Sequence, residues 1–161
     1  LMDMELLITD DLWMLLDVLI AVILGGLIGL EREWRSKPAG LRTNMIISGA
    51  SALFVGLGRH IMLDYAGILN IEAMGMDPIR LLHAVIVGVG FIGAGTIIKS
   101  SDDSKVMYLT TAATIWMSAA VGLSVGLKQY VLGCGVALMM IVINYLFWYL
   151  GKFINRKSNH D

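Results

Sequence analysis

The chain is short of charged residues. Asp, Glu, Lys and Arg make up 16% of its 161 residues, whereas soluble domains carry about 25%. Hydrophobic residues reach 57%, and the mean hydropathy is +0.76. A globule of this length has too little interior to hide so much apolar surface, because the buried fraction rises only slowly with chain length. The composition therefore argues against a soluble domain and favours lipid as the solvent.

The chain has a single cysteine and almost no net charge, and each of these facts excludes a class of protein. The single cysteine, Cys134, excludes a disulfide framework or a thiolate metal cluster within one chain. The net charge of −1 supplies no overall field to attract nucleic acid, so we expect no nucleic-acid partner. The first eleven residues lack the basic segment of a signal peptide, so we expect the first apolar run to be retained.

Long apolar runs are what the sequence has instead. Five of them, each roughly 18–21 residues, would span about 27–32 Å as helices, which is the thickness of a bilayer core. They lie at residues 12–30, 41–58, 81–98, 109–127 and 130–150. The sequence thus predicts an all-α, polytopic membrane protein with five transmembrane helices. Residues 1–11 would form a short extracytoplasmic N-terminus, 12–150 the membrane domain, and 151–161 a short cytoplasmic tail.

Lysine and arginine are divided unevenly between the two sides of such a bundle. One side of the membrane would carry nine basic residues, whereas the other side would have only Arg59, Arg80 and Lys128. Because basic loops stay in the cytoplasm, we expect the first loop and the C-terminus to be cytoplasmic and the N-terminus to lie outside. The cytoplasmic set is Arg32, Arg35, Lys37, Arg42, Lys99, Lys105, Lys152, Arg156 and Lys157.

Glycine is abundant, and Gly88, Gly90 and Gly93 have the G-x-G-x-x-G spacing of a dinucleotide site. Such a site needs an acidic residue about 20 positions further on, inside an alternating α/β domain. Asp102 and Asp103 come too early, and another membrane-length run follows them. We therefore interpret the glycines as helix-packing residues, which let two backbones approach closely in lipid. The predicted packing glycines are Gly25, Gly29, Gly88, Gly90, Gly93, Gly95, Gly122 and Gly126.

Asp17 is the most informative charge, because it lies roughly five residues inside the first span. A charge within hydrocarbon costs about 2.5–3.5 kcal/mol. One interpretation is a polar seam inside the bundle, in which Asp17 pairs with Arg80, Arg59 or His83. The alternative is that Asp17 lies close enough to the interface to stay hydrated.

Polar residues also recur on single helix faces. Asn44, Ser48 and Ser51 are spaced i, i+4, i+7, and a second set in the fourth span is spaced i, i+3, i+7. Such stripes either form hydrogen bonds between helices or line a small hydrated cavity, with Asn144 facing it. The predicted seam comprises Asp17, Asn44, Arg80, His83, Thr111, Thr114, Ser118 and Asn144.

The turn between the first two spans carries both signs of charge. Basic residues there suit anionic headgroups, but Glu31 and Glu33 gain nothing from anionic lipid. Glu31 and Arg42 could form an ion pair that closes this end of the first two helices, leaving Arg35 and Lys37 for lipid or a partner. The predicted cytoplasmic-turn residues are Glu31, Arg32, Glu33, Arg35, Arg42 and Thr43.

Several longer motifs carry a family resemblance. They are "GGLIGLEREWRSKPAGLRTN" at residues 25–44, "DPIR" at 77–80, "GVGFIGAGTII" at 88–98 and "LTTAATIWMSAAVGLSVGL" at 109–127. Together they resemble the MgtC/SapB family of bacterial inner-membrane proteins, from about residue 16 to residue 144. The sequence departs from the family pattern at three places. His83–Ala84 replaces a small residue and Gln, Tyr108 stands where Gly often precedes "LTTAAT", and Lys128 stands where a small residue is expected.

The resemblance implies a five-helix domain in a bacterial cytoplasmic membrane. For MgtC-type members it implies a regulatory role in growth under low magnesium and inside host cells, linked to restraint of the rotary ATP synthase. Many members add a C-terminal soluble domain beyond this region. We expect a homodimer that contacts lipid and other membrane proteins. The alternative is a transporter or channel for magnesium or a monovalent cation.

Enzymatic chemistry has little support in the sequence. No convincing catalytic triad, carboxylate pair or phosphate loop is found, and His83 has no i, i+4 partner of the kind that metal sites use. We therefore expect a protein that is not an enzyme and needs no cofactor, and we assign no metal ligands.

Overall fold

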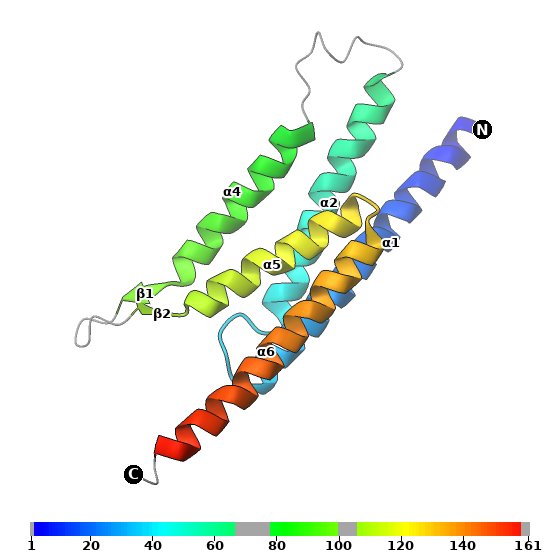
Figure 1. The fold of residues 1–161 in the computed structure, drawn as a ribbon. Coiled ribbons are helices and arrows are strands. Elements are labelled where there is room, and N and C mark those ends of the chain that lie inside the picture. The colour runs from blue at the N-terminus through cyan, green and yellow to red at the C-terminus, as the bar shows by residue number, and fades with distance from the viewer. Residues whose placement is uncertain (1, 67–77, 100–105, 159–161) are drawn as a thin grey trace.

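The computed structural model describes residues 2–66, 78–99 and 106–158, and helices dominate these ranges. All five helices are long and apolar enough to cross a membrane, so the predicted all-α, five-span fold is confirmed. In chain order the helices are α1 (Met2–Trp34), α2 (Leu41–Ala66), α4 (Pro78–Thr96), α5 (Leu109–Gly126) and α6 (Tyr130–Ser158), as Figure 1 shows.

The helices match the predicted spans but extend beyond the outer two. α1 begins at Met2 rather than near residue 12, and α6 continues to Ser158. Helical hydrogen bonding does not end where the apolar run ends, because charged residues such as Glu and Lys are themselves good helix formers. The turn between α1 and α2, the β1–β2 pair and the end of α6 lie toward one end of the bundle (Figure 1).

A very short hairpin joins α4 to α5. Strands β1 (Ile98–Lys99) and β2 (Val106–Met107) pair antiparallel, with Ile98 opposite Met107. The hydropathy pattern extended the third span to residue 98, whereas α4 ends at Thr96, whose hydroxyl donates to the Gly93 carbonyl at 2.7 Å. The β-branched run at 96–98 fits a strand better than a helix end.

Helix α2 lies at the centre of the packing, between α1 and α5, while α4 contacts mainly α5 (Figure 1). Two glycines of α1 and two of α5 lie against α2. A Cβ atom at Gly29 would lie 2.7 Å from the Gly40 carbonyl oxygen, and one at Gly126 would lie 2.7 Å from that of Ala52. Gly25 and Gly122 press on the backbone of α2 in the same way. No side chain fits at these four positions.

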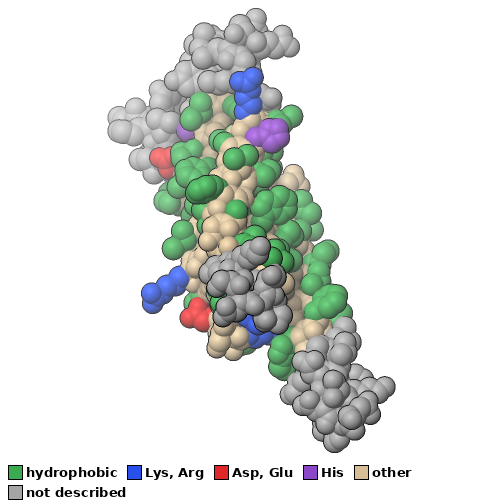
Figure 2. Space-filling model, turned by 90° about the vertical axis from the view of Figure 1, so that its left-hand side faces the viewer, with side chains coloured by type: hydrophobic (Ala, Val, Ile, Leu, Met, Phe, Trp, Pro, Cys, Tyr) green, Lys and Arg blue, Asp and Glu red, His purple; other side chains and the backbone are tan. Residues whose placement is uncertain are grey.

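The glycines of α4 are placed differently. A Cβ atom at Gly88, Gly90 or Gly95 would meet nothing within 4 Å among the described residues, and at Gly93 it would make an ordinary contact with Ala112. Within the described chain, therefore, Gly88, Gly90 and Gly95 do not perform the packing role predicted for them. Gly88 and Gly95 are seven residues apart and share one face of α4, where Gly88 lines a cavity between α4 and α2, whereas Gly90 lies about 200° further round the helix. Figure 2, which views the molecule from the α4 side, shows bare backbone running between hydrophobic side chains.

Two of the departures from the family pattern coincide with left-handed backbone. Tyr108 precedes α5 with φ 66°, and Lys128 follows it with φ 63°. Glycine adopts this conformation without strain, whereas other residues cost about 1–2 kcal/mol. A glycine at residue 108, which the resemblance leads us to expect, would therefore relieve backbone strain, as would a glycine at residue 128.

The close contacts predict an asymmetry between glycines that look alike in sequence. Gly122→Ala should destabilise the protein by about 1–3 kcal/mol, because the new methyl group overlaps the α2 backbone and forces the helices apart. Gly90→Ala should leave stability unchanged or slightly raised, since alanine is the better helix former. The midpoint of thermal unfolding in detergent, followed by circular dichroism, measures both. Equal midpoints for the two variants would contradict the packing described here.

Candidate functional site

Buried polar side chains gather where α2 and α5 face each other. The two stripes predicted from helical spacing lie in this interface, and each of their side chains is 2% exposed or less. The set, called the polar interior below, comprises Asn44, Ser48 and Ser51 of α2 and Thr111, Thr114 and Ser118 of α5.

Asn44 is the best-connected member of the polar interior. Its amide nitrogen donates to the carbonyl oxygens of Ala39 at 2.6 Å and Gly40 at 2.8 Å. Its amide oxygen accepts a 2.7 Å hydrogen bond from the Ser118 hydroxyl. One buried side chain thus ties the turn before α2 to the middle of α5, which fixes where the turn lies against the bundle.

Other hydroxyls of the polar interior bond within their own helices. Ser51 donates to the Ile47 carbonyl and Thr114 to the Thr110 carbonyl, both at 2.8 Å. The Ser48 hydroxyl has no hydrogen-bond partner among the described residues, and it lies where Gly25 and Gly122 approach. Small side chains that satisfy themselves locally let backbones come together. This arrangement favours helix packing over a hydrated cavity.

Arg32 extends the polar interior at the end of α1. It is 5% exposed, and its guanidinium donates to the Thr111 hydroxyl at 2.6 Å and to the Pro38 carbonyl at 3.3 Å. We predicted Arg32 as a residue of the cytoplasmic turn, and its burial was not expected. Arg32 follows Ile28 by four residues and continues the buried face of α1, which becomes evident only once the burial of Ile28 is known.

Asp17 lies at the other end of the bundle, buried, and it does not pair with Arg80, Arg59 or His83. Its carboxylate forms an ion pair with Lys128 and accepts a 2.6 Å hydrogen bond from the Tyr130 hydroxyl. We call these three residues the Asp17 cluster. The tight turn between α5 and α6 places Lys128 and Tyr130 next to the Asp17 carboxylate.

The predicted partners of Asp17 are elsewhere because of how the helices are arranged. Arg80 and His83 lie exposed on α4, which packs against α5 and α2 rather than α1. Sequence order gives no indication of this, because α4 is separated from α1 by the whole of α2. The basic residue that reaches Asp17 is instead the one that departs from the family pattern, Lys128.

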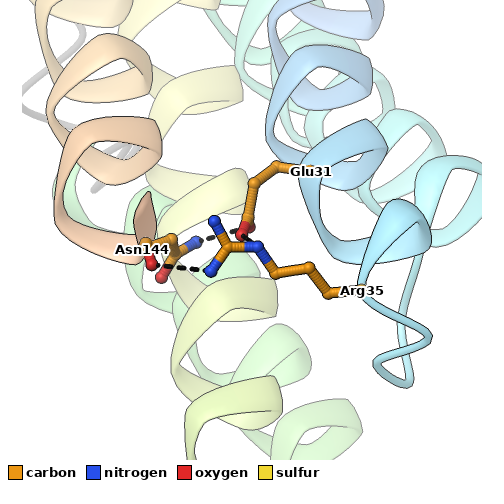
Figure 3. Close-up of polar contacts among 3 residues, drawn as sticks. All are labelled: Glu31, Arg35 and Asn144. Carbon is orange, nitrogen blue, oxygen red and sulfur yellow. Dashed lines mark hydrogen bonds and ion pairs between the residues drawn. The ribbon is translucent and has the colours of Figure 1, made fainter. Parts of the chain in front are cut away.

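A second polar cluster joins α1 to α6 and comprises Glu31, Arg35 and Asn144 (Figure 3). The Arg35 Nε atom lies 2.7 Å from Glu31 Oε1, and the Asn144 amide donates to Glu31 Oε2 at 3.1 Å. Arg35 also donates to the Asn144 backbone carbonyl at 2.9 Å. Its guanidinium lies over the rings of Trp148 at 4.9 Å and Tyr145 at 5.9 Å, within the range of cation–π attraction.

This Glu31 cluster replaces the predicted Glu31–Arg42 pair. Arg42 is exposed on α2, and Glu31 instead uses the arginine four residues further along its own helix. Asn144, which we expected to face the polar stripes, faces Glu31. Glu33 accepts a 2.7 Å hydrogen bond from the Leu41 amide at the start of α2. Thr43 is half-buried beside Asn44 in sequence.

The described part of the chain contains no cluster of side chains typical of a metal site. Within residues 2–66, 78–99 and 106–158 there is no group of three or more His, Cys, Asp or Glu side chains that could hold an ion. Asp17, which is buried, is already paired with Lys128, and Glu31, which is half-buried, with Arg35.

The Asp17 cluster predicts unequal effects of its two charges. Lys128→Gln should cost more than Asp17→Asn, because it leaves a carboxylate that is 3% exposed without its cation, whereas the Lys128 side chain is 30% exposed and can be hydrated. Leaving a buried polar group unsatisfied costs about 1–3 kcal/mol, and more when it is charged. Thermal unfolding in detergent measures both variants. The double variant should recover part of the loss; a double variant as unstable as the summed single variants would contradict the pairing.

The Glu31 cluster predicts a difference between two arginines of the same turn. Arg35→Ala removes an ion pair, a hydrogen bond and two aromatic contacts, and should cost about 1–2 kcal/mol of unfolding free energy. Arg42→Ala, at an exposed position, should change stability by about 0.5 kcal/mol or less. Both are measured by unfolding under identical detergent conditions. A larger effect at Arg42 would restore the pair expected from sequence.

Comparison with known proteins gives the chain a family. A profile of the MgtC family matches residues 18–153. A protein of Escherichia coli strain K12 named "Putative magnesium transporter YhiD" is 38% identical over 143 residues, which are 89% of this chain and 64% of that protein. Protein MgtC of Salmonella typhimurium strain 14028s is 32% identical over 142 residues, 88% of this chain and 55% of that protein. No solved structure matches.

The chain thus spans between about half and two thirds of the length of these relatives. The matched region contains the second half of α1, the other four membrane-spanning helices up to residue 153, the polar interior and the Glu31 cluster. It begins one residue after Asp17, so of the Asp17 cluster it includes Lys128 and Tyr130. This multi-pass membrane protein belongs to the MgtC family.

Proposed function

We propose that this chain is the membrane domain of an MgtC-type regulator of the bacterial inner membrane, active in adaptation to low magnesium. It acts by contact with other membrane proteins, and the membrane sector of ATP synthase is the candidate that the family resemblance supplies. The first loop and the C-terminus face the cytoplasm. The observation that carries the proposal is that three glycines of α4 are left uncovered by the rest of the described chain.

Only 17% of the most apolar stretch of α4 is buried in the described chain, compared with 11% for α6 and 33% or more for the other three spans. Gly88 and Gly95 leave the backbone of α4 open on one flank, and Gly90 leaves it open about 200° round the helix from Gly88. Phe91, which is 83% exposed, lies on the face between these flanks. Membrane helices associate through such small-residue faces, because close backbone contact supplies the attraction that the hydrophobic effect does not supply in lipid. A helix of another protein can therefore approach α4 as closely as α1 approaches α2.

A groove between α2 and α4 lies beside these glycines. α2 and α4 enclose a cavity of about 410 Å³, and its lining is apolar. Ala50 and Phe54 contribute from α2, and Val85, Gly88 and Ile92 from α4. Figure 2 shows hydrophobic side chains over the middle of this side, with charged side chains toward its ends. The surface suits a membrane-embedded helix.

The rival function is cation transport, which the name of the Escherichia coli relative suggests. Magnesium requires several oxygen ligands and keeps part of its water shell. Among the described residues every polar-interior side chain except Ser48 already has a hydrogen-bond partner, and Asp17 is already paired with Lys128. These features weigh toward a contact role.

The proposal is tested in vesicles that contain ATP synthase and sustain a proton gradient. Added wild-type protein should lower the rate of ATP synthesis, and Gly88→Leu should abolish most of that effect by filling the docking face. Gly135→Leu is the matched control, because a Cβ atom at Gly135 on α6 also meets nothing within 4 Å among the described residues. Unchanged synthesis at saturating wild-type protein would reject the synthase as partner. Magnesium influx into liposomes that hold this chain alone would support the transport function instead.

A further inference from the structure

We propose that the cavity beside the Glu31 cluster binds one anionic phospholipid, with its phosphate at Arg32 and Lys37 and an acyl chain along the groove between α1 and α6. The cavity has a volume of about 340 Å³. Glu31, Arg32, Arg35, Lys37, Thr110 and Asn144 line it, together with apolar residues of α6.

The charge balance of this cavity calls for an anion. Three of its lining residues are basic, and Glu31 is acidic. Glu31 is already paired with Arg35, whose guanidinium is also held by Asn144 and the aromatic rings. Arg32 and Lys37 are left with two positive charges and, among the described residues, no carboxylate in ion-pair contact. A phosphodiester is an anion that both can contact.

The burial of Arg32, which is more than nine-tenths buried, strengthens the case for a bound anion. Its hydrogen bonds go to a hydroxyl and a carbonyl, both neutral groups, and its Nε atom has no partner among the described residues. Buried charges in proteins are paired, because an uncompensated charge in a low-dielectric environment is costly. A bound phosphate next to Arg32 supplies the missing counter-charge.

An apolar groove continues from the polar cavity. It has a volume of about 730 Å³ and shares Glu31, Arg35 and Trp148 with that cavity. Its walls are Leu27, Leu30 and Trp34 of α1 and Ile141, Val142, Tyr145 and Leu146 of α6. A charged cavity that opens into an apolar groove, with aromatic rings at the junction, matches a phospholipid rather than free phosphate.

Lipid binding is measured by native mass spectrometry of the detergent-purified chain titrated with dioleoyl phosphatidylglycerol. One molecule should remain bound at concentrations at which phosphatidylcholine, which has the same acyl chains and no net charge, does not. Inorganic phosphate at matched concentration should not compete. Equal retention of the two lipids, or displacement by phosphate alone, would overturn the proposal.

Variants separate a built site from general surface charge. Lys37→Gln, at an exposed turn position, should weaken phosphatidylglycerol binding about fivefold, the effect of one basic residue near an anionic surface. Arg42→Gln is the matched control: it lies on the same turn, is exposed and does not line the cavity, so binding should be unchanged. Circular dichroism verifies that both variants are folded. Equal weakening by the two variants, or none by Lys37→Gln, would overturn the assignment of the site.

Discussion

The close approach of α1 and α5 to the backbone of α2 is the constraint on which the rest of the bundle depends. Lipid provides no hydrophobic force to bring helices together, so attraction must come from contact. Gly25 and Gly122 provide it from opposite sides of Ser48. Because the helices meet there without intervening side chains, the hydroxyls and amide of the polar interior are sealed from lipid. Asn44 then completes its hydrogen bonds within the protein.

Charges obey the same constraint by pairing with what the turns bring near. Lys128 stands at φ 63°, a conformation that favours glycine, yet it supplies the cation for Asp17. The backbone strain of about 1–2 kcal/mol is offset by neutralising a carboxylate that would otherwise be buried alone. Tyr108, at φ 66°, carries a similar strain at the start of α5, and no contact of its side chain in the structure explains it.

Hydropathy and helical spacing were sufficient to predict the five spans and the two polar stripes, because both depend on local sequence. The partner of Asp17 was not predictable in this way, since it depends on which helix lies beside α1. The Glu31–Arg35 pair was predictable, because a spacing of four residues on one helix needs no tertiary information. Arg32 shows a different limit: an arginine at the end of a span reads as solvated until the packing of α1 is known.

The same residue type serves two purposes in this fold, and their separation bears on function. The packing glycines of α1 and α5 lie against α2, so these three helices form one closely packed unit. Those of α4 touch nothing comparable in the described chain, although α4 has the same small-residue character. A helix held to the unit mainly through one neighbour, α5, can present that open face without disturbing the polar interior. The division separates the close packing of α1, α2 and α5 from the two places where we propose contact with other molecules, α4 and the groove between α1 and α6.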